Sequence, residues 1–241
     1  MRIALFSDVH SNLPALEAVL RDIKTRGADG VYCLGDLVGY APFPNEVIDV
    51  IRREGIPTIL GNYDDGVGFD RDECGCAYRK PEEKRLGEIS FQWTKAHVTP
   101  ENKGFLRGLH GELRLEVDGK RILLVHGSPR RINEYLFEDR PLSSFRRLAA
   151  SAQADVVVYG HTHRPYVKTA DGVLFVNVGS TGKPKDGDPR ACYALLEVQA
   201  GKVDVNFQRV PYDLTAVASA IRKSGLPFQF AEQIERGGGL A

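Results

Sequence analysis

Hydrophobic and polar positions along this chain follow two periods, one typical of strands and one typical of helices. Short apolar runs end at Gly, Asp or Asn, and longer segments repeat apolar residues every three or four positions. Within residues 14–26, for example, Val19, Leu20 and Ile23 lie on one helical face. Residues 1–60 therefore predict alternating strands and helices, which calls for right-handed crossovers and a mainly parallel sheet.

The same patterns predict the remaining secondary structure. Strands are expected at residues 2–7, 31–34, 57–60, 113–117, 121–125, 155–159, 167–169, 173–178, 192–198 and 203–209. Helices are expected at residues 14–26, 45–54, 81–96, 101–109, 141–152 and 213–223. Two Asp-Gly turns indicate hairpins, so the second half of the chain should be more antiparallel than the first. Residues 64–80 predict a loop that could cover a site, and residues 230–241 predict a frayed tail.

Size and charge narrow the class of protein. The chain has 241 residues, of which 42% are hydrophobic and 27% charged, so we expect one α/β domain over residues 1–241 with a full core. Lys+Arg and Asp+Glu each number 32, so a dominant basic surface for duplex nucleic acid is not expected, although a local basic patch stays open. Zero net charge protects little against self-association, which keeps a homo-oligomer open.

Hydropathy gives no sign of a membrane segment. No run of 18 apolar residues is present, and residues 2–6 enter a strand without the features of a signal peptide. We therefore expect no membrane contact and a cytoplasmic location.

The chain has four cysteines, Cys33, Cys74, Cys76 and Cys192. Cys33 lies in an apolar strand and predicts a core residue. Cys74 and Cys76 are too closely spaced for a usual zinc knuckle, and no second pair completes one. Free thiols in a loop are the favoured interpretation of this pair, with a redox or extra-metal role as the alternative.

Residues of the types that bind metals gather at the ends of the predicted strands. The carboxyl ends of parallel strands meet at one edge of a sheet, so side chains placed there should converge. Mixed nitrogen and oxygen ligands of this kind suit two hard or borderline divalent cations. The candidate metal ligands are Asp8, His10, Asp36, Asn62, His126, His161 and His163.

Each of these residues alone has a simpler interpretation. Asp8 could be a turn residue and His10 a surface side chain, although an extended backbone would point both to the same face. Asp36 could cap a helix, and Asn62 could be a turn residue after Gly61. The ordered set, not any single member, indicates a metal site.

The order Asp-x-His, Gly-Asp, Gly-Asn, His and Gly-His-x-His resembles that of the calcineurin-like metallophosphoesterases, over about residues 2–180. Residues 35–40 (Gly-Asp-Leu-Val-Gly-Tyr) and 177–182 (Asn-Val-Gly-Ser-Thr-Gly) resemble the small bacterial and archaeal phosphodiesterase branch. The resemblance implies a mixed α/β (α+β) fold, a β-sandwich of two mixed sheets flanked by helices.

The resemblance also implies two metal positions. The first would use Asp8, His10, Asp36 and His163. The second would use Asp36, Asn62, His126 and His161, with Asp36 bridging. Two divalent ions of Mn, Fe, Zn, Ni or Co would clamp a small phosphorylated substrate, and a metal-bridging hydroxide would attack phosphorus. The implied activity is hydrolysis of phosphate diesters or activated phosphate esters, with catalytic roles for Asp36, Asn62 and His126.

The third motif departs from the family pattern. The family usually has His and then an acidic residue after Gly-Asn, whereas here Tyr63 precedes Asp64. A tyrosine with its reference pKa of about 10 brings no positive charge at neutral pH. Loss of a general acid costs on the order of 10²–10⁴-fold. We therefore expect poor activity on alkyl monoesters, raised by Tyr63→His, and we place Asn62, Tyr63 and Asp64 in the catalytic set, with Asn62 and Tyr63 also contacting substrate.

A nearby cation could replace the missing histidine. The candidates lie in loops after His126 and after the last core strand, and surface charge is the simpler interpretation of each. They are Arg130, Arg131, Lys183 and Arg190, of which Arg130 and Lys183 are predicted to bind substrate.

Other functions stay open beside the phosphodiesterase. A binding scaffold of the same fold, weakened in catalysis by Tyr63, is the main alternative, and a nuclease is the third. A protein serine/threonine phosphatase is disfavoured because Gly39 and Tyr40 stand where that branch has Asp-Arg. Substrate recognition is expected from the loops at residues 64–80 and 128–140.

Overall fold

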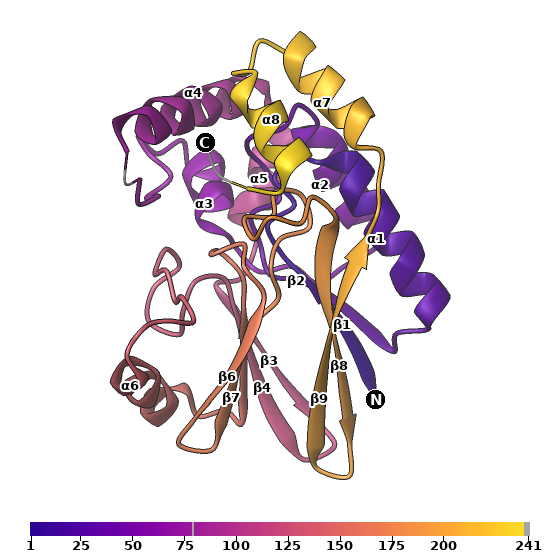
Figure 1. Ribbon diagram of the computed structural model, residues 1–241, viewed down its shortest axis with the longest axis vertical. Helices are drawn as coiled ribbons and strands as arrows, with labels where there is room; N and C mark the ends of the chain where they lie inside the picture. Colours follow the sequence, from indigo (N-terminus) through magenta and orange to yellow (C-terminus); the bar gives the residue numbers. More distant parts are fainter. Residues whose placement is uncertain (79, 239–241) are drawn as a thin grey trace.

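Two mixed β-sheets pack face to face, and helices cover both outer faces of the pair (Figure 1). The computed structural model describes residues 1–78 and 80–238. The strands are β1 (Arg2–Phe6), β2 (Gly30–Cys33), β3 (Glu112–Val117), β4 (Lys120–Val125), β5 (Val156–Tyr159), β6 (Tyr166–Ala170), β7 (Val173–Asn177), β8 (Ala191–Gln199) and β9 (Lys202–Val210). The helices are α1 (Leu13–Arg26), α2 (Pro44–Arg53), α3 (Asn62–Gly68), α4 (Pro81–His97), α5 (Pro100–Arg107), α6 (Leu142–Ala152), α7 (Leu214–Lys223) and α8 (Gln229–Arg236).

Each sheet contains parallel and antiparallel pairs. The first has the order β2-β1-β8-β9, with β1 parallel to β2 and antiparallel to β8. The second has the order β3-β4-β5-β7-β6, in which β4, β5 and β7 are parallel and the two edge strands are joined by hairpins. The predicted sandwich of two mixed sheets flanked by helices is confirmed.

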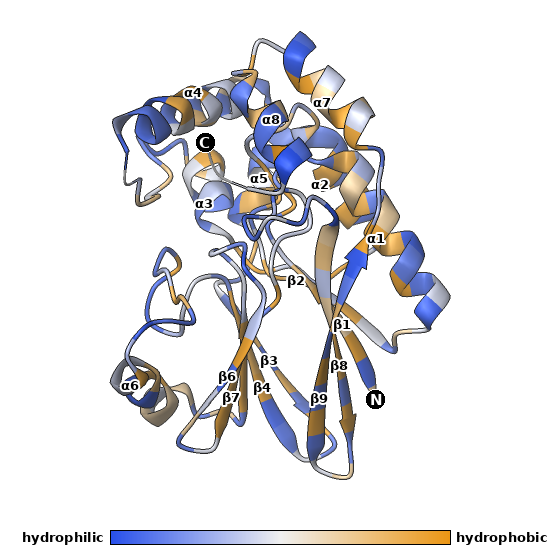
Figure 2. Cartoon of the chain, viewed as in Figure 1, coloured by the Kyte–Doolittle hydropathy of each residue, from blue (hydrophilic) through white to orange (hydrophobic). Residues whose placement is uncertain are grey.

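The core lies in three layers. Ile3, Leu5, Leu124 and Val158 belong to the apolar layer between the two sheets. A second layer packs most of the helices against the outer face of the first sheet, and a third packs α6 against the second sheet. Figure 2 accordingly shows apolar strands and helices that alternate between polar and apolar residues. Strands such as β5 are buried along their whole length, which explains their uninterrupted apolar runs.

The sheet architecture directs several loops to one region. Asp8 follows β1, His126 follows β4 and His161 follows β5, all at the carboxyl ends of strands. Figure 1 shows these loops meeting where the helical half of the molecule joins the sheets. The candidate ligands therefore lie between the sheets and the helical layer.

Three predicted elements are wrong. Residues 57–60 form no strand, because Thr58 bridges only to Cys33 and Ile59 turns instead to His110. The predicted loop 64–80 overlaps α3, whose start is stabilised by the Asp64 carboxylate accepting the backbone N–H of Gly61 at 3.1 Å.

The predicted frayed tail is also wrong over most of its length. Helix α8 buries Phe230, Ala231 and Ile234 against the helical layer. These positions have helical spacing, and Phe230 packs edge-on against Tyr40 at 5.2 Å between ring centroids. The last three positions of the predicted tail, 239–241, lie outside the described residues.

The expectation that Cys33 is a core residue is confirmed, and the expectation of free thiols at Cys74 and Cys76 is wrong. Cys33 and Cys192 are buried free cysteines, whereas Cys74 and Cys76 form a disulfide in the loop after α3. A backbone turn at Gly75, with φ +67°, brings the two sulfur atoms together.

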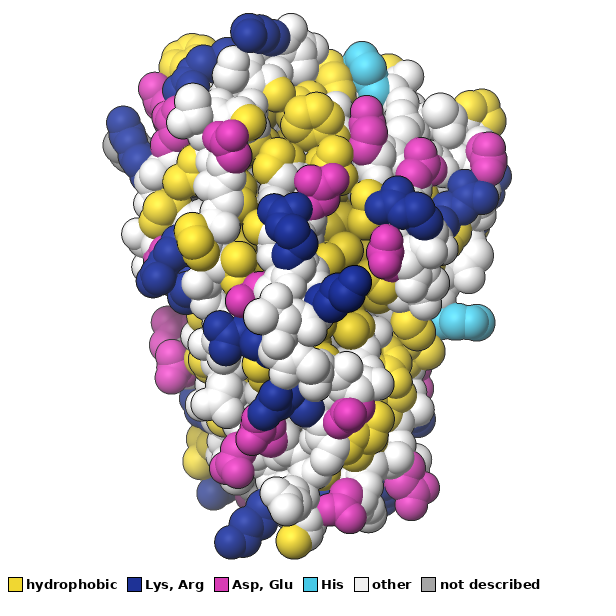
Figure 3. Space-filling view, turned by 90° about the vertical axis from the view of Figure 1, so that its right-hand side faces the viewer, with side chains coloured by type: hydrophobic (Ala, Val, Ile, Leu, Met, Phe, Trp, Pro, Cys, Tyr) yellow, Lys and Arg dark blue, Asp and Glu magenta, His cyan; other side chains and the backbone are white. Residues whose placement is uncertain are grey.

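Among the described residues, no helix combines the length and apolar character that crossing a bilayer requires. On the face shown in Figure 3, acidic and basic side chains are interspersed. This mixing agrees with equal numbers of acidic and basic residues.

Candidate metal centre

The ligand loops adopt backbone conformations that ordinary residues rarely occupy. Asp8, His10, Asp36, His161 and His163 have φ values of +54°, +47°, +55°, +63° and +60°, all in the left-handed region. The prediction that an extended backbone would align Asp8 with His10 is therefore wrong. Tight turns deliver the side chains instead, and such strain concentrates at functional sites.

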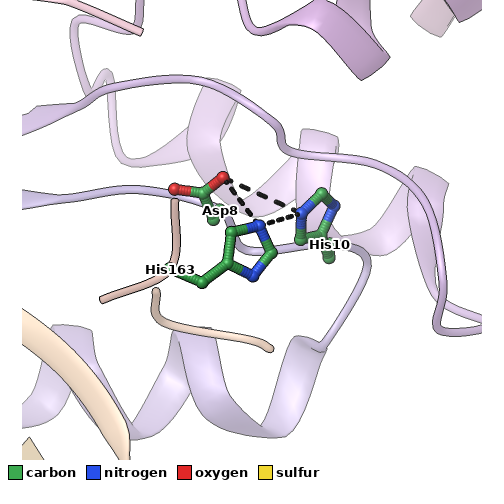
Figure 4. A group of neighbouring side chains, drawn as sticks. All are labelled: Asp8, His10 and His163. Atoms are coloured by element: carbon green, nitrogen blue, oxygen red, sulfur yellow. Dashed lines mark hydrogen bonds and ion pairs between the residues drawn. The ribbon is translucent and has the colours of Figure 1, made fainter. Parts of the chain in front are cut away.

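Asp8, His10 and His163 form the first ligand group (Figure 4). His10 Nε2 lies 3.2 Å from His163 Nε2, and His163 Nε2 lies 3.2 Å from Asp8 Oδ1. His10 Nε2 also approaches Asp8 Oδ1 at 3.8 Å. All three side chains are buried and direct their ligand atoms at one point.

Asp36, His126 and His161 form the second ligand group. His126 Nε2 lies 3.4 Å from Asp36 Oδ2 and 3.1 Å from the Asn62 side-chain oxygen. Asn62 thus sits beside this group, as predicted, and can offer it a neutral oxygen ligand. The His161 ring packs edge-on to that of His126 at 5.0 Å between centroids.

Asp36 lies between the two groups. Its Oδ2 atom is 3.7 Å from His10 Nε2 and 3.4 Å from His126 Nε2. Its other oxygen, Oδ1, accepts the backbone N–H of Tyr63 at 2.8 Å, which fixes the carboxylate. This position is the one that a carboxylate bridging two cations requires.

Three histidines direct their Nε2 atoms toward these points. The Nδ1 atoms of His10, His126 and His163 lie 3.0, 2.7 and 2.5 Å from backbone carbonyl oxygens. Because a carbonyl only accepts, each Nδ1 donates, which leaves Nε2 as the atom that can bind a metal once it is unprotonated. Figure 4 shows two such Nε2 atoms facing each other.

Two buried polar atoms support a cation in each group. Within the described structure, Asp8 Oδ1 and His161 Nε2 are buried and have no hydrogen-bond partner. An unpaired buried polar atom is costly, and a bound cation would satisfy both. A carboxylate and two imidazoles in each group fit divalent transition metals.

Electrostatics favour cations at the same points. Burial lowers the pKa of His126, but the charges of Asp36 and Asp8 outweigh it and raise that pKa to about 10. Burial lowers the pKa of His10 and of His161 to about 3, so both rings are neutral at pH 7. The surrounding histidines hold the pKa of Asp36 below its usual value in spite of burial. One proton on His126 thus occupies a position that a metal ion would take.

Two glycines allow the loops to approach this closely. Gly35 has φ +87°, and a Cβ there would collide with the backbone of Gly61. A Cβ on Gly61 would in turn collide with the backbone and carboxylate of Asp36. The second and third motifs therefore need glycine so that their loops can contact each other.

The side chains of Tyr63 and Asp64 form hydrogen bonds with neighbouring helices and loops. Tyr63 is 1% exposed, and its hydroxyl lies 3.4 Å from Ser90 Oγ in α4. Asp64 accepts the backbone N–H groups of Leu37 at 2.9 Å and Gly61 at 3.1 Å. The structure gives no support to the predicted substrate contact of Tyr63, and Asp64 joins the second and third motif loops.

Of the four predicted replacement cations, only Lys183 is buried beside the centre. Arg130 pairs with Glu134, and Arg190 forms a two-pronged ion pair with Asp188, both at the surface. Arg131 is exposed as well. Lys183 is 6% exposed, and its carbonyl oxygen accepts from His163 Nδ1.

A cavity of about 760 Å³ begins beside the ligands. Its lining includes Thr162, between two ligand histidines, and Tyr135, whose ring packs on His161 at 3.9 Å. Tyr40, which packs on His10 at 4.8 Å, and Lys183 border it too. Sequence reasoning missed the three aromatic and hydroxyl residues, although Tyr135 lies in the predicted recognition loop 128–140.

The loop that carries the disulfide touches the second ligand group. The Asn62 side-chain amide donates to the Cys74 carbonyl oxygen at 2.9 Å. This bond orients the amide so that its oxygen faces His126. No local sequence pattern indicates this contact, because it joins positions twelve residues apart through a turn.

Known proteins share the motifs and the fold. A family model described as "Calcineurin-like phosphoesterase superfamily domain" matches residues 1–201. Uncharacterized protein MJ0912 of Methanocaldococcus jannaschii is 34% identical over 249 residues and covers 96% of both chains. Phosphodiesterase YfcE of Escherichia coli K12 is 27% identical, over 82% of this chain and 88% of that protein. A crystal structure of a metallophosphoesterase from Sphaerobacter thermophilus matches with a TM-score of 0.80 and 30% identity, over 98% and 99% of the two chains. The chain therefore belongs to the calcineurin-like phosphoesterase superfamily.

Proposed function

We propose that this protein hydrolyses phosphate diesters or activated phosphate esters with two divalent cations. The observation that supports this most is the pair of buried Asp/His groups with Asp36 between them. The cations would be held by Asp8, His10 and His163 on one side and by Asn62, His126 and His161 on the other, with Asp36 shared. Bound there, two divalent cations supply a water of lowered pKa and neutralise charge on the phosphoryl oxygens.

The protein's own contribution is to fix the ligands in place before substrate binds. Backbone carbonyl groups hold three imidazole rings by their Nδ1 atoms, and a backbone N–H holds Asp36. Such orientation by neighbouring groups strengthens metal binding by about 10–100-fold. The net reaction forms one phosphorus–oxygen bond from water, breaks the ester bond and leaves an alcohol or phenol.

The preference for diesters or activated esters follows from what surrounds the centre. An alkoxide leaving group needs a proton, and the Tyr63 hydroxyl that could have supplied it contacts α4 instead. A nitrophenolate leaves without that help. The similarity to a phosphodiesterase at 27% identity also supports a preference for diesters.

Rates on two model substrates test this proposal. Protein reconstituted with Mn²⁺ should hydrolyse bis-p-nitrophenyl phosphate faster than p-nitrophenyl phosphate. Protein that holds two metal ions and turns over neither substrate would overturn the proposal and favour a binding scaffold of the same fold. Faster cleavage of the monoester would overturn the diester preference alone.

A further inference from the structure

The cavity beside the ligand groups contains a buried lysine side chain. Lys183 is 6% exposed, lines the cavity, and forms no ion pair or hydrogen bond through Nζ with any residue in the described ranges. Its Nζ lies 4.5 Å from the ring centroid of Tyr40 and 6.0 Å from that of Phe230. Burial and the nearby Lys185 lower the pKa of Lys183 well below its usual value, and Glu83, which also lines the cavity, opposes them. An anion bound beside Nζ would stabilise the charged form of this side chain.

Two further cations lie on the same side of the cavity. Lys185 donates its backbone N–H to the His163 carbonyl at 3.2 Å, and Arg164 donates through Nε to the Lys185 carbonyl at 3.0 Å. Both residues line the cavity, and neither forms an ion pair with a carboxylate of the described residues. Three basic side chains thus border the first ligand group, where a phosphoryl group would bind.

The other sides of the cavity are aromatic. Tyr40, Tyr78 and Tyr135 all line it, and Tyr135 continues the stack that begins at His161. Flat rings of this kind bind a flat ring of a ligand, with about 1–3 kcal/mol for each stacked base. A volume of about 760 Å³ accommodates a ligand of that size beyond the phosphoryl group.

Acidic side chains lie at the mouth. Glu138 and Asp139 are exposed and line the cavity on the loop that also carries Tyr135. Carboxylates accept hydrogen bonds from amino groups of the kind found on nucleobases. The cavity lining therefore combines basic side chains, aromatic rings and carboxylate acceptors, among them Glu83.

We propose that the cavity selects phosphoesters in which a second phosphate adjoins the reacting one and leads to a nucleobase, that is, nucleotides with two or more phosphates. The second phosphate binds Lys183, Lys185 and Arg164, and the base stacks among the tyrosines. This inference rests on the proposed phosphoesterase function, because it assigns the reacting phosphate to the two ligand groups.

Binding measurements test this inference separately from catalysis. The probe is α,β-methylene-ADP, which lacks a hydrolysable bridge oxygen, titrated calorimetrically into Mn²⁺-loaded protein freed of excess metal. We expect it to bind at least about tenfold more tightly than adenosine or methylenediphosphonate, each of which fills only part of the cavity. Equal affinity for methylenediphosphonate alone would overturn the nucleobase site.

Two variants and a control locate the binding. Lys183→Met and Lys185→Met should each weaken α,β-methylene-ADP binding about tenfold or more, since each removes a charged contact. Lys202→Met, on the exposed turn between β8 and β9, should leave it unchanged. Because Lys183 is buried, the thermal midpoint of each variant is measured first, and Lys185→Met carries the test if Lys183→Met is unfolded.

The outcomes separate the two proposals. Tight, lysine-dependent binding with no cleavage of bis-p-nitrophenyl phosphate would overturn the proposed hydrolysis and keep the nucleotide site. Cleavage of bis-p-nitrophenyl phosphate, together with a nucleotide affinity that is unchanged in both lysine variants, would overturn the nucleotide site and keep the hydrolysis.

Discussion

The two ligand groups differ in what holds them. The first rests on the packed aromatic core, where the His10 ring meets Tyr40 at 4.8 Å and Tyr63 at 5.5 Å. The second borders surface loops, because Asn62 is oriented by the Cys74 carbonyl and His161 packs on the partly exposed Tyr135. Interior packing keeps ligands preorganised, whereas loops open at lower cost. We therefore expect the first group to bind metal more tightly than the second.

Removing the shared carboxylate should have the largest effect, because it damages both groups at once. Asp36→Asn should lower kcat on bis-p-nitrophenyl phosphate on the order of 10³-fold and reduce the bound metal at micromolar concentrations. Asp118→Asn, in the turn between β3 and β4, is the matched control and should retain full activity. Activity of Asp36→Asn within tenfold of the parent protein would show that Asp36 does not bridge.

Acid should weaken metal binding at the second group. In the metal-free protein the carboxylates raise the pKa of His126 to about 10, so a proton must leave before a metal binds. At pH values below this pKa, each increase of one pH unit should therefore raise the metal association constant about tenfold. One proton should be released for each metal ion bound. Calorimetric titrations in buffers of different ionisation enthalpy at pH 7 and pH 8 measure that proton, and a pH-independent constant would contradict the assignment.

Changing Asn62 should affect one group only. Asn62→Ala should weaken the second metal by about 10–100-fold and leave the first within a few-fold, because only the second group contains the Asn62 oxygen. Asn133→Ala is a suitable control, since Asn133 bonds the Gly75 carbonyl of the same loop at 3.1 Å but touches no ligand. Equal weakening of both metals by Asn62→Ala would remove the distinction between the groups.

The smallest effect is expected at Tyr63. Its hydroxyl makes two long contacts, 3.4 Å to Ser90 Oγ and 3.5 Å to the Gly87 carbonyl. Tyr63→Phe should therefore change kcat on bis-p-nitrophenyl phosphate by less than about threefold, at a cost of about 1 kcal/mol in unfolding free energy. A drop in kcat of tenfold or more, without loss of metal, would return Tyr63 to the catalytic set.

The residues of the two groups could be proposed from sequence because most of them come soon after an apolar strand and their order resembles a known family. Their backbone conformations could not. Asp8 donates its N–H to Gly35 and His10 donates to Asp36, at 2.9 and 3.0 Å, so neighbouring loops impose the left-handed turns. Such contacts cannot be inferred from a local sequence pattern. Alternation along a strand therefore pointed to the correct side chains, Asp8 and His10, but predicted the wrong backbone conformation for them.

The cavity could not be predicted from sequence either, because its residues are far apart along the chain. Its Tyr40, Tyr78, Tyr135, Lys183 and Phe230 come from five separate segments, and only packing of α8 and the loops brings them together. Helix α8 itself was missed because glycines follow it, although Phe230 and Ile234 have helical spacing. Lys183 is one of four candidate cations in the sequence, of which Arg130 and Lys183 are predicted to bind substrate, and only the structure shows that Lys183 is buried and Arg130 exposed.

The central claim, two metal positions of unequal strength, is tested most directly by titrating metal-free protein with Mn²⁺ at pH 8 in a calorimeter. The account predicts two equivalents per chain in two resolved steps, and loss of only the weaker step in Asn62→Ala. A single equivalent, or no heat of binding at all, would contradict it.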